Sequence, residues 1–199
     1  GHDMNREYRV LSALQGFYSH APKPLLYTDD KSVMGAEFYV MERVKGVILR
    51  GQPPKDLTLT PATMRSISEA CVDHLAELHL MDLDKAGLAD FGKPEGYTER
   101  QVTGWIKRYF NSQTDDLPAM AEVASWLSKN IPEQKHVSFI HNDYKYDNLV
   151  LNPEKLDEII AVLDWEMSTV GKPLMDLGTS LAYWAQPDDS EALRAFSLT

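Results

Sequence analysis

The segment HNDYKYDN, residues 141–148, contains side chains that could perform chemistry, and apolar runs flank it on both sides. Asp143 and Asn148 belong to this segment, and Asp164 follows the second of the two apolar runs that come after it. If these two runs pair as an antiparallel hairpin, Asn148 and Asp164 come to the same end of the strands. An amide and a carboxylate there suit Mg²⁺, which takes few protein ligands and completes its shell with water and phosphate oxygens. Asp143, five residues before Asn148, could accept a proton from an attacking hydroxyl.

These residues also permit two different interpretations. The first is a polar turn between strands, with Asp164 only capping the next segment, although the ordered set is harder to obtain by chance than either short motif alone. The second is a metal-dependent hydrolase that uses His141, Asp143 and Asp164, which predicts a histidine ligand and a transition metal. The asparagine at position 148, a poor zinc ligand, counts against the hydrolase.

Composition limits the class of protein. The 199-residue chain is 43% apolar and 25% charged, as expected of a globular protein with a sizeable core. Its net charge of −10 disfavours binding to nucleic acid or to an anionic membrane. Cys71 is the one cysteine, so no internal disulfide can form, and its place in an apolar helical pattern predicts a packed thiol in a reducing compartment. With no long apolar run and no secretory pattern, we expect a cytoplasmic protein.

The elements that must position the site can be predicted from periodicity and turn signals. Apolar residues recur at helical spacing between Met64 and Leu78, after a Thr60–Pro61 start, and predict an amphipathic helix. Gly, Pro and polar residues over 45–60 predict a connection between two parts of the structure. Further expectations are helices over 3–14, 99–110, 119–129 and from Pro173 to Trp184, strands over 25–27, 37–41, 137–140, 148–151 and 158–163, and turns at TDDKS and NPEKLD.

The site motifs resemble the catalytic loop and metal-binding segment of the kinase-like phosphotransferases, specifically the aminoglycoside phosphotransferase family. HND, four intervening residues and Asn148 have the H-x-D-x-x-x-x-N spacing of kinases. DWE, residues 164–166, stands where protein kinases have DFG. The resemblance implies an α+β, protein-kinase-like fold, with a mostly helical large lobe and a remnant of the small β lobe. It also implies transfer of the γ-phosphoryl group of ATP to a hydroxyl of a small molecule.

Roles follow from the resemblance one position at a time. It implies Asp143 as the catalytic base and Lys145 as the residue that meets the transferred phosphate. Asn148 and Asp164 are implied as Mg²⁺ ligands, and His141 as a support of the loop backbone.

The resemblance extends along the chain. REYRVLSAL, from residue 6, resembles the small-lobe helix whose glutamate, here Glu7, pairs with a strand lysine that holds phosphates of ATP. EFYVMERVKG resembles the strand and hinge between lobes, where the backbone of Glu42 and Val44 would meet adenine. The implied domains are a partial small lobe over 1–44 and a large lobe over 45–199.

Three further polar residues receive no chemical role. Asp176, in PLMDLG, resembles the family residue that orders the catalytic loop, and His79 is interpreted as a satisfied histidine at a helix end. ADFG, residues 89–92, contains a literal DFG, but it precedes the HND loop, whereas the family places its metal aspartate after that loop. Asp90 is therefore not predicted to bind metal.

The acceptor is suggested by a finer resemblance over residues 87–120. This stretch is similar to the branch of the family that is fused to, or encoded beside, acyl-CoA dehydrogenases. The resemblance implies a hydroxyacyl or hydroxyacyl-CoA acceptor, with an aminoglycoside-like acceptor as the alternative. It also implies an acyl-CoA dehydrogenase as a partner or fused domain. Tyr97, Arg100, Gln101 and Trp105 could face the acceptor. The competing interpretation is that Trp105 is core and Arg100 solvated.

The chain departs from the complete family pattern at its start. No nucleotide-covering loop or phosphate-binding lysine precedes residue 3, so we expect a piece of a longer enzyme that is inactive by itself. Strands over 25–41 without partners would expose sheet edges, which favours a partner chain, such as a second copy in a homodimer, or a rearranged strand pairing. A noncatalytic, pseudokinase-like binding module is the alternative function.

Overall fold

The computed structural model describes residues 3–50, 57–133, 135–186 and 188–196, and its architecture is α+β. The helices are α1 (Met4–Leu14), α2 (Lys31–Met34), α3 (Pro61–Leu80), α4 (Tyr97–Ser112), α5 (Pro118–Lys129), α6 (Pro173–Ala182) and α7 (Glu191–Phe196). The strands are β1 (Pro24–Thr28), β2 (Phe38–Met41), β3 (Ser138–Ile140), β4 (Leu149–Asn152), β5 (Lys155–Val162) and β6 (Thr169–Gly171).

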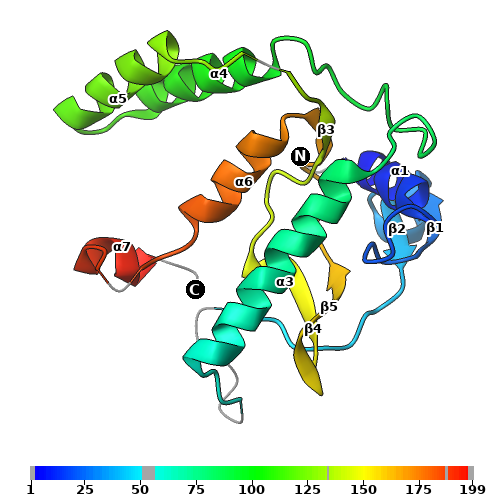
Figure 1. The fold of residues 1–199 in the computed structure, drawn as a ribbon. Helices are drawn as coiled ribbons and strands as arrows, with labels where there is room; N and C mark the ends of the chain where they lie inside the picture. Colours follow the sequence, from blue (N-terminus) through cyan, green and yellow to red (C-terminus); the bar gives the residue numbers. More distant parts are fainter. Residues whose placement is uncertain (1–2, 51–56, 134, 187, 197–199) are drawn as a thin grey trace.

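The strands form three small antiparallel sheets, β1–β2, β3–β6 and β4–β5. Helix α3 packs across β5 and β3, and α1 packs on β1 and β2. Figure 1 shows α1, β1 and β2 gathered on one side of α3, whereas α4 and α5 lie side by side and project on the other side. Helix α6 lies between this helical pair and α3.

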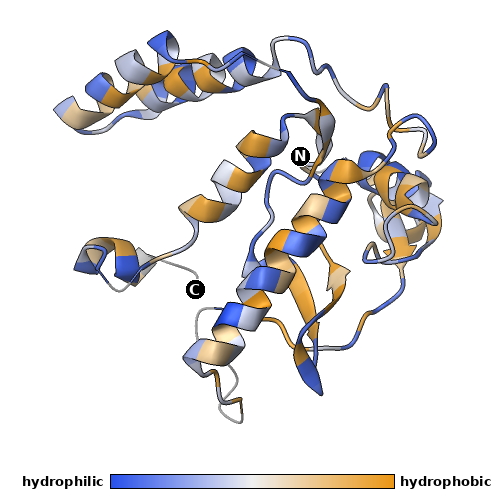
Figure 2. Cartoon of the chain, viewed as in Figure 1, coloured by the Kyte–Doolittle hydropathy of each residue, from blue (hydrophilic) through white to orange (hydrophobic). Residues whose placement is uncertain are grey.

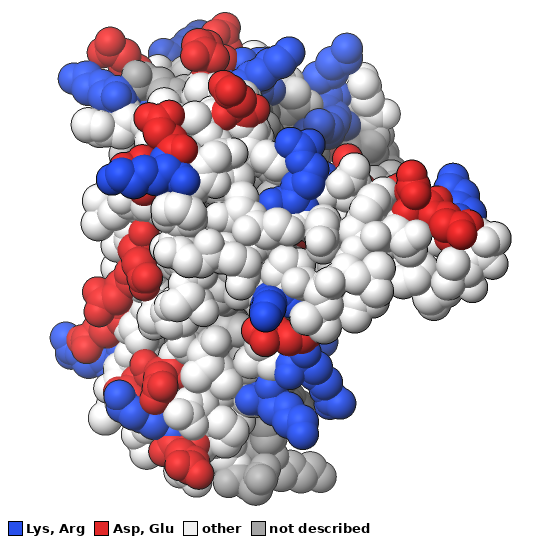
Figure 3. Space-filling view, turned by 90° about the vertical axis from the view of Figure 1, so that its right-hand side faces the viewer, with Lys and Arg blue, Asp and Glu red and all other residues white. Residues whose placement is uncertain are grey.

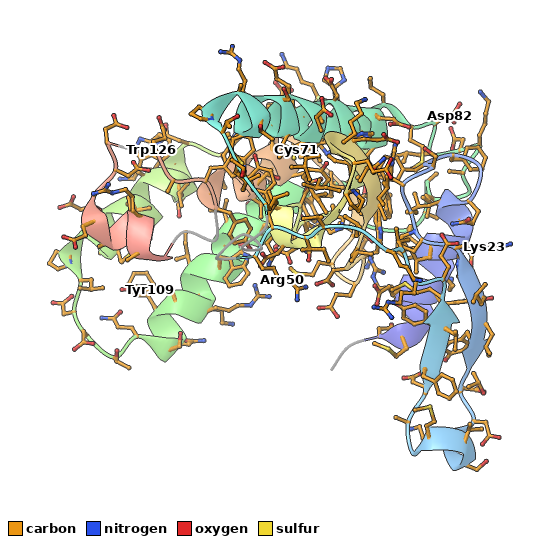
Figure 4. The ribbon with its side chains drawn as sticks, turned by 90° about the horizontal axis from the view of Figure 1, so that it is seen from below. Lys23, Arg50, Cys71, Asp82, Tyr109 and Trp126 are labelled. Atoms are coloured by element: carbon orange, nitrogen blue, oxygen red, sulfur yellow. The ribbon has the colours of Figure 1, made fainter. Side chains whose placement is uncertain are left out.

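Helix α3 has the boundaries and the buried face that the sequence predicts. The Thr60 hydroxyl accepts a hydrogen bond from the Thr63 N–H at 3.1 Å, and Pro61 occupies the first turn. Its buried residues are Ile67, Cys71, Leu75 and Leu78. Figure 4 places Cys71 on the inward side of the helix, where burial raises the pKa of its thiol to about 12. The prediction of a packed thiol is therefore confirmed.

The β4–β5 hairpin sets the spacing of the site residues. Leu149 pairs with Val162, and beyond that pair the Leu163 N–H donates to the Asn148 carbonyl at 2.8 Å. Figure 2 shows that both strands consist mostly of hydrophobic residues, which suits strands covered by α3. Strand β5 begins earlier than predicted, because Asn152 pairs with Lys155 and leaves only two residues in the turn.

Several short features differ from the predictions. TDDKS is not a simple turn: it leads into α2, whose first turn is capped by Asp30, which accepts from the Ser32 N–H at 2.9 Å. Strand β6 was not predicted, since three residues give too short a pattern. Trp184 lies beyond the end of α6 and stacks on Tyr146, with ring centroids 5.9 Å apart.

The two predicted lobes share a hydrophobic core. Val10, Leu11 and Leu14 of α1 belong to the same buried cluster as Ile67 of α3 and Trp165. The boundary at residue 45 stays a prediction, but α1 is packed directly against the part that carries the HND loop. The position of Glu7 on α1 is therefore fixed relative to that loop.

None of the helices in the described ranges combines the length and the apolar character needed to cross a bilayer. On the face shown in Figure 3, acidic and basic side chains are interspersed around a largely uncharged area.

The DFG-like tripeptide has a packing role. Asp90 is exposed, whereas Phe91 lies under the Arg6 guanidinium, 4.3 Å from the ring centroid, and contacts Phe139 edge-on. A Cβ on Gly92 would lie 2.5 Å from Thr169 Oγ1 and 2.9 Å from the Val170 nitrogen. The tripeptide is therefore packed against β6.

We expect Gly92→Ala to destabilise the protein by about 1–3 kcal/mol, because β6 would have to move away from the new methyl group. Urea titration followed by circular dichroism measures this change. Gly104→Ala in α4 is the control: its Cβ would meet nothing within 4 Å, and the substitution should stabilise the helix by about 0.5–1 kcal/mol. A Gly92→Ala variant as stable as the original would contradict the prediction.

Candidate active site

The HND loop is held in place by the carboxylate of Asp176. This residue lies in the first turn of α6 and is fully buried. Its Oδ2 accepts from the His141 N–H at 2.8 Å and from His79 Nε2 at 2.9 Å, and its Oδ1 accepts from the Asn142 N–H at 2.7 Å. The loop is thus tied to both α6 and α3, and the structural roles predicted for Asp176 and His79 are confirmed.

His141 supports the loop through both of its ring nitrogens. Nε2 donates to the Leu163 carbonyl at 2.9 Å, and Nδ1 accepts from the Asp143 N–H at 3.3 Å. The ring is fully buried and packs on Trp165 with centroids 4.7 Å apart; burial lowers the pKa of His141. A neutral histidine with both nitrogens engaged has no lone pair for a metal, so the hydrolase lacks its predicted ligand.

Two other predicted site residues, Asn148 and Lys145, contact Asp143. Asn148 Nδ2 donates to the Asp143 carbonyl at 2.9 Å and to its Oδ2 at 3.1 Å. Lys145 Nζ lies 2.9 Å from the same Oδ2. On the other side the Tyr183 hydroxyl donates to Asp143 Oδ1 at 2.9 Å. The loop therefore presents one carboxylate with a fixed orientation, and the side chain of Asp143 keeps 15% of its surface exposed.

The Asp143 carboxylate lies between Lys145 and Tyr183, and the pKa values of both side chains are raised. Burial disfavours the charge on Lys145, but the hydrogen bond and the charge of Asp143 outweigh it and raise the pKa of the ammonium. Burial, followed by the hydrogen bond to Asp143, raises the pKa of the Tyr183 phenol. At neutral pH the site therefore contains a cation, a phenol that donates a hydrogen bond, and the carboxylate between them.

Asp164 lies next to this group because of the hairpin. Asp164 comes two residues after the last strand pair, Leu149–Val162, and directly after Leu163, whose N–H donates to the Asn148 carbonyl. Its φ of 68° is a left-handed conformation that aspartate tolerates better than most residues. The carboxylate is exposed, and no hydrogen-bond donor among the described residues pairs with it. This is the end of the hairpin at which the sequence predicted Asn148 and Asp164 to meet.

Glu7 is joined to the DWE segment. Its Oε1 accepts from the Trp165 N–H at 3.1 Å, and the side chain is 8% exposed. Burial is the largest influence that raises the pKa of Glu7, and the charges of Asp164 and Glu166 add to it. Within the described residues no lysine or arginine reaches Glu7, so the predicted pairing with a lysine is not observed in this part of the chain.

The predicted hinge residues follow β2. The Glu42 N–H donates to the Lys23 carbonyl at 2.9 Å, and Glu42 Oε1 accepts from the Lys23 N–H at 3.0 Å. Because the Glu42 N–H is already bonded, the carbonyl is the one backbone group of Glu42 that could accept a hydrogen bond from an adenine. Val44 has no backbone hydrogen-bond partner among the described residues. Neither Glu42 nor Val44 is hydrogen-bonded to the residues around Asp143.

A cleft of about 1160 Å³ opens beside Asp143, between α4 and α6. Gln101 and Trp105 of α4 line it as expected, and Trp105 is 59% exposed, so the interpretation of Trp105 as core is wrong. Arg100 does not line the cleft: its guanidinium donates to the carbonyls of Lys93 and Glu95 in the preceding loop. The whole lining consists of Tyr97, Gln101, Trp105, Arg108, Asn142, Asp143, Met167, Thr169, Met175, Gly178, Thr179, Ala182 and Tyr183.

Tyr183 and Arg108 were missed from the sequence. Tyr183 comes seven residues after Asp176, and two full helical turns return it to the same face of α6. Arg108 follows Trp105 by three residues, and its guanidinium lies 4.7 Å from the Trp105 ring centroid. Helical spacing from residues already under consideration was the available signal in both cases.

The fold and the HND loop define the class of kinase-like phosphotransferases, and solved structures agree. A protein from Ralstonia eutropha described as a candidate aminoglycoside phosphotransferase has a TM-score of 0.82 and 36% identity, covering 94% of this chain and 56% of that one. Aminoglycoside phosphotransferase APH(3'')-Id from Streptomyces rimosus, solved with ADP and streptomycin, has a TM-score of 0.64 at 17% identity, covering 96% and 71% of the two chains. The latter likeness is one of fold alone.

Residues 1–198 match the model of the phosphotransferase enzyme family, and the chain belongs to that family. It is 42% identical to human acyl-CoA dehydrogenase family member 11 over 190 residues, which cover 94% of this chain and 24% of the human protein. It is 36% identical to mouse acyl-CoA dehydrogenase family member 10, covering 98% and 18%. The chain therefore spans about a quarter or less of the length of these relatives.

We expect Asp176→Asn to lower the free energy of unfolding by about 2–4 kcal/mol, because one amide oxygen cannot accept from all the donors that the two carboxylate oxygens now serve. Chemical denaturation measures this loss. Asp157→Asn, at an exposed position on β5, is the matched control and should stay within about 0.5 kcal/mol of the original protein. Equal stability of the two variants would show that Asp176 does not anchor the loop.

Proposed function

We propose that this chain carries the catalytic loop of an ATP-dependent phosphotransferase that moves the γ-phosphoryl group to a hydroxyl of a small molecule. The observation that carries this proposal is the position of Asp143 between a cleft and a pair of oxygen ligands. Its Oδ1 faces Tyr183 and the cleft, while its Oδ2 is bonded to Asn148, whose carbonyl in turn accepts from the residue before Asp164.

The residues at the end of the hairpin fit a Mg²⁺ ion. Since Asn148 Nδ2 is bonded to Asp143, the amide oxygen is the atom left for a metal. The Asp164 carboxylate is exposed and has no donor among the described residues. An amide oxygen and a carboxylate are hard ligands of the kind that Mg²⁺ takes. When bound, Mg²⁺ supplies neutralisation of the charge on the phosphate oxygens.

Asp143 is the proposed catalytic base, because it can accept the proton of an acceptor hydroxyl. The hydroxyl of Tyr183 already donates to Oδ1 in the way that an acceptor hydroxyl would. Lys145 is placed beside Oδ2, where a cation can meet the transferred phosphoryl group. Phosphoryl transfer depends mostly on position and charge neutralisation, so this set covers the requirements on the acceptor side of the reaction.

The lining of the cleft favours a hydroxyacyl or hydroxyacyl-CoA acceptor over an aminoglycoside. A polycationic aminoglycoside needs several acids, but Asp143 is the one acid among the described residues of the lining. The lining instead offers Arg108, which suits an anionic group, and the apolar surface of Trp105 and two methionines. The relatives named acyl-CoA dehydrogenases are several times longer than this chain, which supports a dehydrogenase as a fused domain or partner.

On the longest natural form of the protein, we expect Asp143→Asn to lower kcat by about 10²–10⁴-fold, because the base is lost, while nucleotide binding remains. We expect Asp164→Ala to abolish Mg²⁺-dependent binding of ATP. Calorimetry with and without Mg²⁺ and a coupled kinase assay measure the two effects. Asp90→Asn, which changes the exposed acid of the DFG-like tripeptide, should alter neither quantity. An Asp143→Asn enzyme that keeps its rate would overturn the proposal.

We expect Trp105→Ala to raise KM for a hydroxyacyl-CoA by about tenfold, since an aromatic contact of about 1–2 kcal/mol is lost. Steady-state kinetics with kcat and KM measured separately tests this. The matched control is Trp126→Ala on α5: Trp126 is 62% exposed and does not line the cleft, and Figure 4 labels it on the helical pair. If both variants have the same KM, α4 does not bind the acceptor.

A further inference from the structure

A second group of ligand-type side chains lies outside the cleft and the HND loop. His20 comes from the segment between α1 and β1, and His74 and Glu77 lie one turn apart on α3. Their ligand atoms all lie within 4.8 Å of one another, and no other group of three or more His, Cys, Asp or Glu side chains in the described residues meets this condition. The cluster shares no residue with the proposed phosphotransferase site.

The distances between these atoms are close to those within a metal coordination shell. Glu77 Oε2 lies 3.7 Å from His20 Nε2 and 3.4 Å from His74 Nδ1. With Zn–N and Zn–O bonds of about 2.0–2.1 Å, neighbouring ligand atoms of a tetrahedral zinc site lie about 3.3–3.4 Å apart. Adjustments of a few tenths of an ångström would therefore allow the three atoms to bind one ion.

One of these nitrogens is unsatisfied. His74 Nδ1 is buried and has no hydrogen-bond partner among the described residues, which is unusual for a buried polar atom. The side chains of His74 and His20 are 21% and 18% exposed, and that of Glu77 is 47% exposed, so the group is both partly enclosed and open to solvent. An ion could enter from the Glu77 side.

The two histidines are held by the surrounding backbone. The His20 carbonyl accepts from the Val162 N–H at 2.7 Å, and the Tyr18 hydroxyl donates to the His74 carbonyl at 3.4 Å. The His20 and His74 rings meet edge to face with centroids 4.0 Å apart. Burial, and then the neighbouring His74, lower the pKa of His20, which favours the neutral ring that coordinates metals.

We propose that His20 Nε2, His74 Nδ1 and Glu77 Oε2 form a binding site for a divalent transition metal of the zinc type. Two imidazoles and one carboxylate suit Zn²⁺, whereas Mg²⁺ and Ca²⁺ prefer ligand sets made of oxygen. Water completes the shell on the exposed side. The bound ion joins the segment after α1, which carries His20, to α3. The His20 carbonyl accepts from Val162 at the end of β5, so the ion also fixes this segment against the hairpin that leads to Asn148 and Asp164.

Calorimetric titration of the metal-free protein with Zn²⁺, without nucleotide, tests this site. Excess Mg²⁺ is present throughout, so that Mg²⁺ and not Zn²⁺ occupies the oxygen ligands near Asp143. We expect one tight site. Co²⁺ should give an absorption spectrum of a low-coordinate complex. At a Zn²⁺ concentration about a hundredfold above Kd, Tm should rise by about 5–10 °C.

His74→Gln and Glu77→Gln should each weaken Zn²⁺ binding by about tenfold or more, since loss of a ligand costs at least as much as loss of a residue that orients one. His136→Gln is the matched control: this histidine is exposed and outside the cluster, and its removal should leave Kd unchanged. Glu77 is nearly half exposed, so Glu77→Gln is expected to fold, as circular dichroism checks. Wild-type affinity in Glu77→Gln, or an equal loss in His136→Gln, overturns the proposal.

Discussion

The buried carboxylate of Asp176 is the interaction on which the site depends. A lone carboxylate at full burial would be strongly unfavourable, so its two oxygens must receive donors. They receive them from the backbone of His141 and Asn142 and from the ring of His79. The same contacts that satisfy the acid fix the direction of the HND loop. The orientation of Asp143 toward the cleft is a consequence of this requirement.

Three aspartates of similar intrinsic chemistry acquire different roles through their surroundings. Asp176 is enclosed and fully bonded, Asp143 is bonded by a cation and a phenol at the edge of a cleft, and Asp164 is exposed without a donor among the described residues. A carboxylate satisfied by the protein stabilises the fold, and one that is not satisfied is available to a metal. The donors around each acid are therefore consistent with Asp176 as the anchor and with the proposed roles of Asp143 as base and Asp164 as metal ligand.

Two further features of the chain lie beside or outside the HND loop. Helix α4 supplies the cleft with Trp105 and Arg108, and the relatives with 36–42% identity are named for acyl-CoA dehydrogenases. The cluster of His20, His74 and Glu77 lies outside the cleft, where β5 meets the segment after α1. Because the two proposed sites share no residue, variants of one can be tested without altering the other.

The sequence by itself determined the helix from Pro61, the hairpin that joins Asn148 to Asp164, and the ordered motif around Asp143, because each rests on local spacing. The fold class followed from the resemblance of that motif to the kinase-like phosphotransferases. Tertiary structure decided the features that depend on contacts between distant segments. In the folded chain the Glu7 carboxylate accepts from the Trp165 N–H, and the Arg100 guanidinium donates to carbonyls of the preceding loop. Trp105 lines the cleft, and the Tyr183 hydroxyl donates to Asp143. Strand β6 was too short to carry a periodic signal, and its pairing with β3 exists only once the chain is folded.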